Sequence, residues 1–187
     1  MPGPSGAHPD LGAVFDAHVA YEFEAEDVDA TMGTMVDEPY VTHVPTLAGG
    51  VGAEAVRHFY GTHFIGMWPD DVAITHVSRT VDGDRVVDEM VMDFTHDRVM
   101  DTFLPGLAAT GRPVRLPVVV VAGFEGGKVA YEHIYWDQAS LLVQVGALDR
   151  SDLPVTGAEQ AAKLLDKDRP CNELIDRAEQ RGPPRPR

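Results

Sequence analysis

Apolar residues near the start of the chain recur at the spacing of a helix. Leu11, Phe15 and His18 follow one another at steps of three or four positions, directly after Asp10. Residues three and four apart share one face of a helix, and aspartate is a preferred N-cap residue. The pattern therefore predicts a helix that begins after Asp10 and a second, shorter helix across residues 27–36.

A short strand and a third helix are expected next. Pro39 is expected to end the second helix, and residues 40–44 (YVTHV) have the composition of a strand that stops at Pro45. The glycines of residues 49–52 predict a loop, and residues 53–64 predict a helix. One face of that helix carries Val56, Phe59, Tyr60 and His63.

The period of the pattern changes after residue 70. Residues 72–81 and 85–97 flank the turn D-G-D, and residues 113–124 and 128–137 flank the turn E-G-G. Strand-like segments on either side of such turns are typical of β-hairpins. The sequence thus predicts two hairpins, joined by a long loop at residues 102–113.

The order of the elements favours an α+β fold. Helices come first, antiparallel strands follow, and further helices are expected at residues 138–146 and within 151–178. Four consecutive valines, Val118–Val121, place apolar side chains on both faces of one strand, so both faces should be covered. Helices would cover one face, and a homodimer is the simplest cover for the other.

Composition and charge narrow the range of partners. The chain has 187 residues, is 44% hydrophobic and 24% charged, and carries a net charge of −15. Such a chain can bury a core, and its negative field disfavours nucleic acid and anionic membranes as partners. The longest apolar stretch, residues 116–122, is too short to span a membrane, and the first ten residues do not resemble a secretory signal. We therefore expect a cytoplasmic protein.

Several common catalytic motifs do not occur. None of the four serines lies in G-x-S-x-G, and the single cysteine, Cys171, is not preceded by a predicted strand. The segment GGVG at residues 49–52 lacks the lysine and spacing of a phosphate-binding loop. No fixed-spacing set of metal ligands occurs either. We expect no cofactor and no metal.

The segment EHIYWD at residues 132–137 is the densest group of titratable residues. Strand alternation places Tyr131, His133, Tyr135 and Asp137 on one face, and Glu132, Ile134 and Trp136 on the other. A histidine beside a half-buried carboxylate can exchange protons near neutral pH. We interpret Asp137 and His133 as a candidate acid/base pair. The alternative is that both residues pair with neighbours at a sheet edge.

Three further residues could contribute to such a site. Glu89 shares one face of its strand with Val91, although it could equally be a solvated charge. His43 in the first strand and His63 on the third helix are the remaining candidates. A lone histidine is more often a core residue than a catalyst, but residues on elements that converge could line one cavity.

Several segments together resemble the SnoaL-like branch of the nuclear transport factor 2-like superfamily. The resemblance spans about residues 12–149 and rests on DVDATMGTMVDEPYVTHVPTLAGGVG, FYGTHF, VVDEMVMDFTHD, and GKVAYEHIYWDQASLLVQVG, whose W-D-Q-A-S-x-L-x-Q-x-G portion is the most specific. It implies a cone-shaped α+β barrel, in which a bent antiparallel sheet wraps around N-terminal helices and encloses an apolar pocket, and frequent homodimers. A domain at residues 10–149, a helical extension at 150–178, and disordered tails at 1–9 and 179–187 follow from this resemblance and from the composition.

The resemblance also implies a chemistry. Polyketide cyclases, ketosteroid isomerase and scytalone dehydratase are similar enzymes that use pocket carboxylates, histidines and tyrosines without cofactors. We expect a cofactor-independent isomerase, cyclase or lyase acting on a small apolar or aromatic carbonyl compound. In the SnoaL-like pattern, an aspartate before the last helix often lines the pocket, and Asp137 matches it. Catalysis is assigned to Asp137, His133 and Glu89, and substrate binding to His43, Tyr60, His63, Phe64, Tyr131, Tyr135 and Trp136.

Two alternatives remain open at this stage. A water-activating hydrolase of an epoxide or lactone is the nearest rival, although the Asp-Arg-Asp set of epoxide hydrolases is not recognisable because no arginine is evident between the strand carboxylates. A noncatalytic small-molecule binding module is the other, since one fold hosts many functions.

Overall fold

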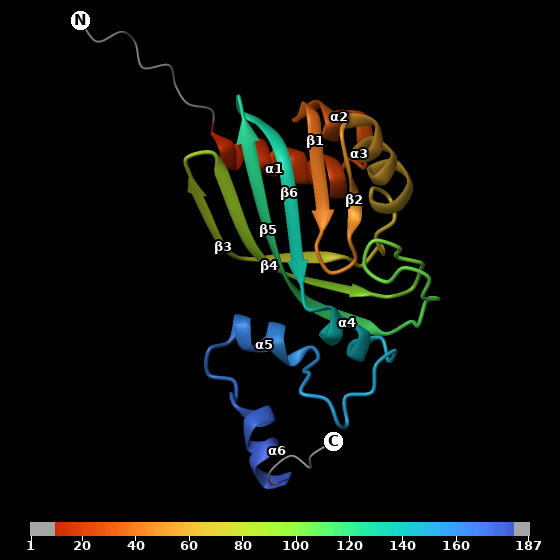
Figure 1. Cartoon of the computed structure of the whole chain (residues 1–187), viewed down its shortest axis with the longest axis vertical. Helices are drawn as coiled ribbons and strands as arrows, with labels where there is room; N and C mark the ends of the chain where they lie inside the picture. The colour runs from red at the N-terminus through yellow and green to blue at the C-terminus, as the bar shows by residue number, and fades with distance from the viewer. Residues whose placement is uncertain (1–9, 182–187) are drawn as a thin grey trace, which may run out of the picture.

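A bent six-stranded sheet forms the body of the protein. The computed structural model describes residues 10–181, so the proposed tail at 1–9 and most of the one at 179–187 lie outside the described residues. The strands are β1 (Met35–His43), β2 (Ala48–Val51), β3 (Ala73–Asp82), β4 (Arg85–Thr95), β5 (Pro113–Glu125) and β6 (Lys128–Trp136). Their order in the sheet is β2-β1-β6-β5-β4-β3 (Figure 1). The predicted α+β class is confirmed, and the sheet is bent but not closed into a barrel.

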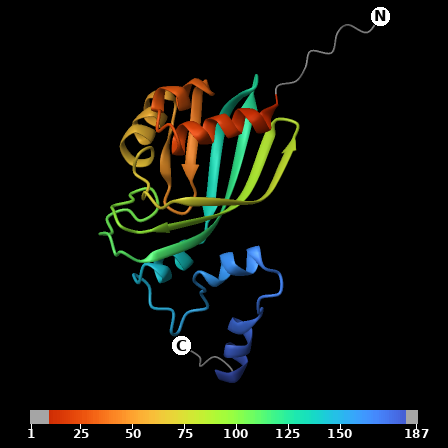
Figure 2. The ribbon, with the colours of Figure 1, turned by 180° about the vertical axis from the view of Figure 1, so that it is seen from behind.

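Helices cover the concave face of the sheet and extend beyond one end of it. They are α1 (Leu11–Phe23), α2 (Val28–Gly33), α3 (Ala53–Phe59), the π-helical turn η1 (Tyr60–Phe64), α4 (Gln138–Gln144), α5 (Glu159–Leu165) and α6 (Glu173–Arg181). Figure 2 shows α1 lying across the sheet, whereas α5 and α6 lie past its end. None of the helices formed by residues 10–181 is long and apolar enough to cross a membrane.

Aspartate side chains determine where three of these helices begin. Asp10, Asp27 and Asp137 each have an extended backbone and accept a hydrogen bond from the backbone N–H three residues later. This contact satisfies one of the amide groups left without a partner in the first turn. The predicted start of α1 is therefore confirmed, and Asp137 marks the end of β6 and the start of α4.

The two predicted hairpins are present. β3 pairs with β4 and β5 pairs with β6, both antiparallel, and β4 pairs with β5 over its whole length. The loop that joins the hairpins places Phe103 and Leu104 in the core. Its Thr102 hydroxyl donates to the backbone carbonyl of His63. The loop thus closes the end of the sheet against the helical segment.

The sequence prediction was wrong for residues 34–39. Strand β1 begins at Met35 and includes Pro39, which was expected to end a helix. The registry with β6 is irregular between Met35 and Tyr40, and a proline is tolerated at such an irregularity because no ladder hydrogen bond is needed from it. The β1–β6 pair is parallel, so the sheet is not entirely antiparallel.

The glycine segment is a strand and not the predicted loop. Gly49 and Gly50 belong to β2, which pairs with β1 at the sheet edge. A Cβ atom on Gly49 would lie 2.0 Å from the carbonyl oxygen of Val41, and one on Gly50 would lie 2.7 Å from the backbone of Ala55. Only glycine allows this approach of three backbone segments.

Candidate active site

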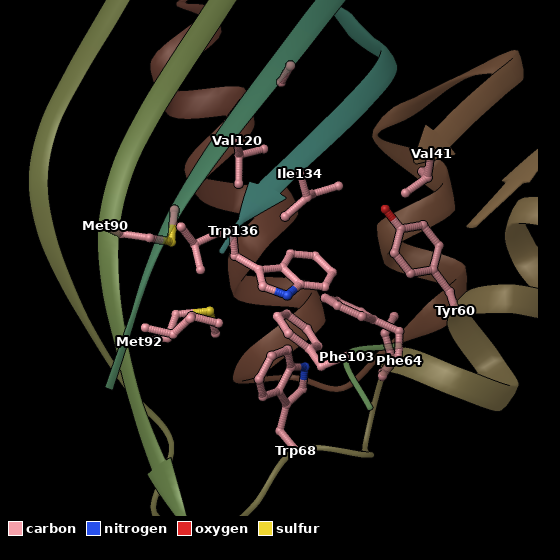
Figure 3. Close-up of a cluster of buried hydrophobic side chains, with 14 of the residues drawn as sticks. Val41, Tyr60, Phe64, Trp68, Met90, Met92, Phe103, Val120, Ile134 and Trp136 are labelled. Atoms are coloured by element: carbon pink, nitrogen blue, oxygen red, sulfur yellow. The ribbon is translucent and has the colours of Figure 1, made fainter. Parts of the chain in front are cut away.

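A mostly apolar cavity lies between α1, the α3–η1 segment and the concave face of the sheet. Its free volume is about 50 Å³. A buried water needs roughly 10–15 Å³ by such a measure, so the space suits about four waters or a small compound. Figure 3 shows Tyr60 facing this space from the helical side, opposite Met90 and Met92 of β4. Aromatic side chains make up much of its wall: Phe15, Phe23, Tyr60, Phe64, Trp68 and Phe103.

Four polar side chains meet at one end of the cavity. His18 and Glu22 lie one turn apart on α1, Tyr60 begins η1, and Glu132 lies on β6; all four are at most 5% exposed. The His18 Nε2 atom lies 3.3 Å from a carboxylate oxygen of Glu22 and 3.3 Å from Oε2 of Glu132. The Tyr60 hydroxyl donates to the same Oε2 at 2.7 Å. Glu22, Tyr60 and Glu132 line the cavity, and His18 lies behind them.

The hydroxyl of Thr34 fixes the orientation of the His18 ring. It donates to the carbonyl oxygen of Thr31 at 2.6 Å, and it lies 2.6 Å from His18 Nδ1. Because the single hydroxyl hydrogen goes to Thr31, the Thr34 oxygen must accept from Nδ1. His18 therefore carries a hydrogen on Nδ1 and turns Nε2 toward the two carboxylates.

Charge balance divides the protons of the cluster unequally. Burial alone would lower the pKa of His18, but the carboxylates of Glu132 and Glu22 outweigh it and raise that pKa to about 10. Burial would raise the pKa of Glu132, but the His18 charge and hydrogen bonds from His18 and Tyr60 lower it. Burial raises the pKa of Glu22, and His18 only partly offsets this rise. One imidazolium thus stabilises the charge of Glu132, while Glu22 holds its proton more tightly than an ordinary glutamate.

Two further groups line the cavity in neutral form. Burial, together with Glu132 and Glu22, raises the pKa of Tyr60 well above its usual value. Burial lowers the pKa of His43 to about 4, although Glu132 opposes this shift. Among residues 10–181, the buried Nδ1 of His43 has no hydrogen-bond partner. His43 is therefore a neutral imidazole at the cavity wall.

A second polar group lines the cavity at the β4 side. Asp88 is fully buried and accepts two hydrogen bonds from Arg79, from Nε at 2.6 Å and from Nη2 at 2.6 Å. Arg79 also donates to Asp16 of α1 at 2.7 Å. No arginine between two strand carboxylates was evident in the sequence. In the structure, Arg79 instead bridges a strand aspartate and a helix aspartate. That arrangement was not evident because Asp16 is distant from the strands in sequence.

Three of the sequence-predicted substrate residues line the cavity: His43, Tyr60 and Phe64. His63 does not. An α-helical period places it beside Tyr60, but the segment is π-helical, with a hydrogen bond from Ile65 N–H to the Tyr60 carbonyl. The wider turn brings Phe64 inward and leaves His63 half-exposed, 3.7 Å from Asp101.

The predicted acid/base residues do not reach the cavity. Asp137 caps α4 and accepts a hydrogen bond from the side chain of Gln160 in α5, so its carboxylate is engaged there. His133 lies on the outer face of the sheet. Glu89 also faces outward, where it accepts from Ser78 at 2.9 Å. The predicted alternation is correct, but the residues assigned to the pocket lie on the opposite face of each strand.

The remaining aromatic residues of the prediction divide between the two faces. Tyr131 and Tyr135 lie on the outer face, and Tyr135 is 44% exposed. Trp136 faces inward and is buried, but it packs against Phe103 with ring centroids 4.3 Å apart and does not line the cavity. These three residues therefore do not contact the space in which a ligand would lie.

Four residues of the site were not predicted from the sequence: Glu22, Glu132, Asp88 and Arg79. A signal for the first was present, since Glu22 follows His18 by four positions on the apolar face of α1. For Glu132 the alternation with Ile134 and Trp136 was also visible, but aromatic residues on both faces of β6 gave no means of choosing the inner one. The Arg79–Asp88 pair needs the β3–β4 registry, in which the two residues are directly opposite.

The ligand atoms of His18, Glu22 and Glu132 lie within 4.8 Å of one another, and within residues 10–181 they form the one group of this kind close enough to hold a metal ion. Imidazole and carboxylate are ligands that zinc and non-haem iron accept. The observed contacts, however, are explained by a shared imidazolium proton, which already balances one carboxylate.

The bent sheet, the helices on its concave face and the apolar cavity define an α+β domain with the nuclear transport factor 2-like fold. Residues 15–132, well over half of the chain, match the family model described as SnoaL-like domain. The chain therefore belongs to the SnoaL-like family. A comparison with curated proteins gives no match.

Several solved structures have the same fold. A candidate SnoaL-like polyketide cyclase from Jannaschia is 17% identical, with a TM-score of 0.58 over 77% of this chain and 99% of that one. AclR, a candidate hydroxylase from Streptomyces galilaeus, is 19% identical, with a TM-score of 0.55 over 74% and 97%. A ketosteroid isomerase-like protein from Catenulispora acidiphila, solved with trimethylamine, is 17% identical, with a TM-score of 0.54 over 71% and 92%. At these identities the likeness concerns the fold alone.

Proposed function

We propose that this protein is a cofactor-independent acid/base enzyme that acts on a small carbonyl compound by removing and returning a proton. One observation carries the proposal: two carboxyl groups, Glu132 and Glu22, face one apolar cavity, and their surroundings shift their pKa values in opposite directions. Pairs of titratable groups whose pKa values are separated in this way are typical of acid/base sites.

Glu132 is the proposed base. Its contacts with His18 and Tyr60 both use Oε2, so among the described residues Oε1 stays free to accept a hydrogen from the substrate carbon next to the carbonyl. The electron pair of the broken C–H bond moves into the carbonyl group and gives an enolate or enol. His18 acts through Glu132 as a positioning residue, because its charge keeps this carboxyl ionised in an apolar setting.

Glu22 is the proposed acid. Because burial raises its pKa, it retains a proton that can be donated to the substrate oxygen as charge develops there. Neutral His43 lines the same space and offers a second polar contact. The enolate or enol can then react in three ways. It becomes an isomer if the proton returns to another of its carbons, and a dehydrated product if it expels a β-hydroxyl as water. It closes a ring if its carbon attacks a second carbonyl group of the same molecule.

The size of the cavity favours small substrates. A free volume of about 50 Å³ does not hold a polycyclic polyketide. The proposal therefore shares with the neighbour named polyketide cyclase only the type of chemistry and not a polycyclic substrate.

Exchange of hydrogen for deuterium tests the proposal. In D₂O, the protein should speed deuterium incorporation next to the carbonyl of pentan-2-one or 4-hydroxybutan-2-one above the buffer rate, as measured by ¹H NMR. Glu132→Gln should slow this exchange by about 10²–10⁴-fold, the usual contribution of a general base. Glu125→Gln, an exposed carboxylate at the end of β5, is the matched control. Exchange at the buffer rate with the wild-type protein would contradict the proposal.

A water-activating hydrolase of an epoxide or lactone is the second candidate, because the Asp16–Arg79–Asp88 group contains two carboxylates joined by an arginine. In this group only Asp88 lines the cavity, whereas the Asp16 side chain is 64% exposed, so the second carboxylate is not placed to hold a water beside the first. Incorporation of ¹⁸O from labelled water into a product would favour the hydrolase. Ligand binding without exchange or hydrolysis would favour a noncatalytic binding module.

We further propose a homodimer formed through the outer face of the sheet. Tyr131, His133, Val119 and Val121 are only partly covered on this face, and Tyr135 is exposed. Helix α5 packs against β5, and no residue of the extension after 150 lines the cavity among those described. The extension therefore adds to the surface around the sheet and does not contribute to the pocket.

A further inference from the structure

We infer that Asp88, held by Arg79, is a binding subsite for a neutral hydroxyl group, so that the substrate is a hydroxylated carbonyl compound. The inference deepens the proposed function, on which it rests for the carbonyl end of the substrate. It assigns a role to a buried charged pair that the acid/base chemistry does not use.

Burial of the Asp88 carboxylate in this part of the sheet is energetically unfavourable. The inward-facing positions of β4 around it are Val86, Met90 and Met92, all buried and apolar. Removing a carboxylate from water is unfavourable unless partners replace the lost hydration. Arg79 supplies part of that replacement from the neighbouring position of β3.

Asp88 lines the cavity and has hydrogen-bonding capacity that Arg79 does not use. A carboxylate offers about four lone-pair sites, and Arg79 occupies one site on each oxygen. The next inward residue across the sheet from Asp88 is Val120 of β5, which has no polar group. Asp88 lines the cavity, so a ligand group is the natural donor to its free sites.

Charge indicates which donor fits. The guanidinium of Arg79 already balances the charge of Asp88, and it is anchored by Asp16 and by the ring of Phe15, 5.7 Å away. A second cation would be repelled by Arg79, whereas a neutral hydroxyl adds a hydrogen bond without changing the charge. A hydroxyl group is therefore favoured over an amine.

The registry gives the span between the two polar ends. Asp88 is opposite Val120, Val120 is opposite Ile134, and Glu132 lies two residues from Ile134 on the same face. Two strand spacings and two residues place the Cα atoms of Asp88 and Glu132 roughly 12 Å apart. Side chains extend inward from both, so a compound with a hydroxyl two carbons from its carbonyl matches the space.

A matched pair of ligands tests the inference. 4-Hydroxybutan-2-one and pentan-2-one have the same shape and differ by a hydroxyl in place of a methyl group. Their affinities are measured by ¹H–¹⁵N NMR titration in H₂O, where hydrogen exchange leaves no trace. ¹H spectra of each sample, recorded alongside, measure the amount of hydroxy compound that remains intact, and this amount is used as the ligand concentration. The wild-type protein should bind the hydroxy compound about tenfold more tightly, as expected for a hydrogen bond to a charged group. The Nε–H signal of Arg79 should shift with the hydroxy compound and not with pentan-2-one.

Variants localise the effect. Asp88→Asn should reduce the preference to about threefold or less, because an amide is a weaker acceptor than a carboxylate. Asp93→Asn is the control: Asp93 lies on the outer face of β4 and pairs with the cross-strand Arg115, so it loses an equivalent ion pair away from the cavity. It should keep the full preference.

The outcomes separate this inference from the proposed function. Equal affinities for the two compounds, no binding of either, or an unchanged preference in Asp88→Asn would overturn the inference. If Asp88→Asn does not fold, the wild-type comparison and the Arg79 signal still decide it. A hydroxyl preference without deuterium exchange would support the subsite and refute the acid/base activity, and exchange without any preference would do the reverse.

Discussion

The Nε2 atom of His18 lies 3.3 Å from a carboxylate oxygen of Glu132, although 114 positions separate the two residues in the sequence. The contact joins the first helix to the last strand of the sheet and stabilises one ionised carboxyl at an apolar cavity.

Removal of the imidazole should destabilise the fold. His18→Leu replaces the imidazole with an apolar side chain of similar size and leaves Glu132 without its charged partner. Loss of one member of a buried pair costs about 3–5 kcal/mol of unfolding free energy. Urea unfolding followed by circular dichroism measures the loss. The double variant His18→Leu/Glu132→Leu should recover part of it. A single variant as stable as the wild-type protein would show that His18 and Glu132 do not form an ion pair.

Stability should fall as the pH becomes alkaline. The pKa of His18 is about 10 in the folded protein, against 6.5 for an ordinary histidine. Because the folded value is the higher, the stabilisation is complete below pH 6.5 and is lost as the pH rises from there through 10. The free energy of unfolding, measured at steps from pH 6 to pH 10, should decline over this range. In His18→Leu the decline should flatten, and an equally steep decline in that variant would assign it to other groups.

The contribution of His43 to stability should fall toward acid pH, opposite to that of His18. Its pKa is about 4 in the folded protein, below the ordinary value of 6.5. The unfolded chain therefore binds the proton more readily, and the stabilisation present above pH 6.5 is lost as the pH falls toward 4. A ¹⁵N NMR titration should find the His43 ring neutral at pH 6 while the His18 ring is still protonated at pH 8. A charged His43 ring at pH 6 would contradict the neutral state assigned to His43. A neutral His18 ring at pH 8 would contradict the charge assigned to His18.

Asp137 is expected to serve the structure and not the chemistry. Asp137→Asn keeps an N-cap residue but weakens the contact with Gln160, so a loss of about 1 kcal/mol or less is expected. Deuterium exchange by this variant should equal that of the wild-type protein. Loss of exchange with full retention of stability would instead restore the catalytic role predicted from the sequence.

The outer face of the sheet should mediate dimerisation. Tyr135→Glu places a charge on this face, opposite the same face of a second copy, and should yield a monomer by size-exclusion chromatography with light scattering. Thr62→Glu, at an exposed position of η1 on the opposite side of the sheet, is the control and should remain dimeric. A monomeric wild-type protein would refute the proposed dimer.

Periodicity predicted most of the elements but not the interior of the site. The hairpins and α1 follow from alternation and helical spacing, which depend on local sequence. Residues 34–52 were mispredicted because Pro39 and the glycines of β2 are explained only by contacts with other strands. Tertiary contacts outweigh local preference in such segments.

The site shows the same limit. Alternation correctly separated Glu132 from His133, but it cannot tell which face is inward when both carry aromatic residues. His63 was misplaced because a π-helical turn has a longer period than the α-helix that was assumed. Tyr60 and His43 line the cavity as expected, because Tyr60 precedes the wider part of the turn and His43 follows the alternation of residues 40–44.

The most direct test of the account is the titration of the two cavity carboxyl groups. Side-chain ¹³C NMR of the wild-type protein, with Glu22→Gln and Glu132→Gln used to assign the signals, follows each carboxyl as the pH changes. The account predicts that Glu22 titrates above the ordinary glutamate value of 4.5 and Glu132 below it. Two carboxyl groups that titrate together near 4.5, or in the reverse order, would contradict it.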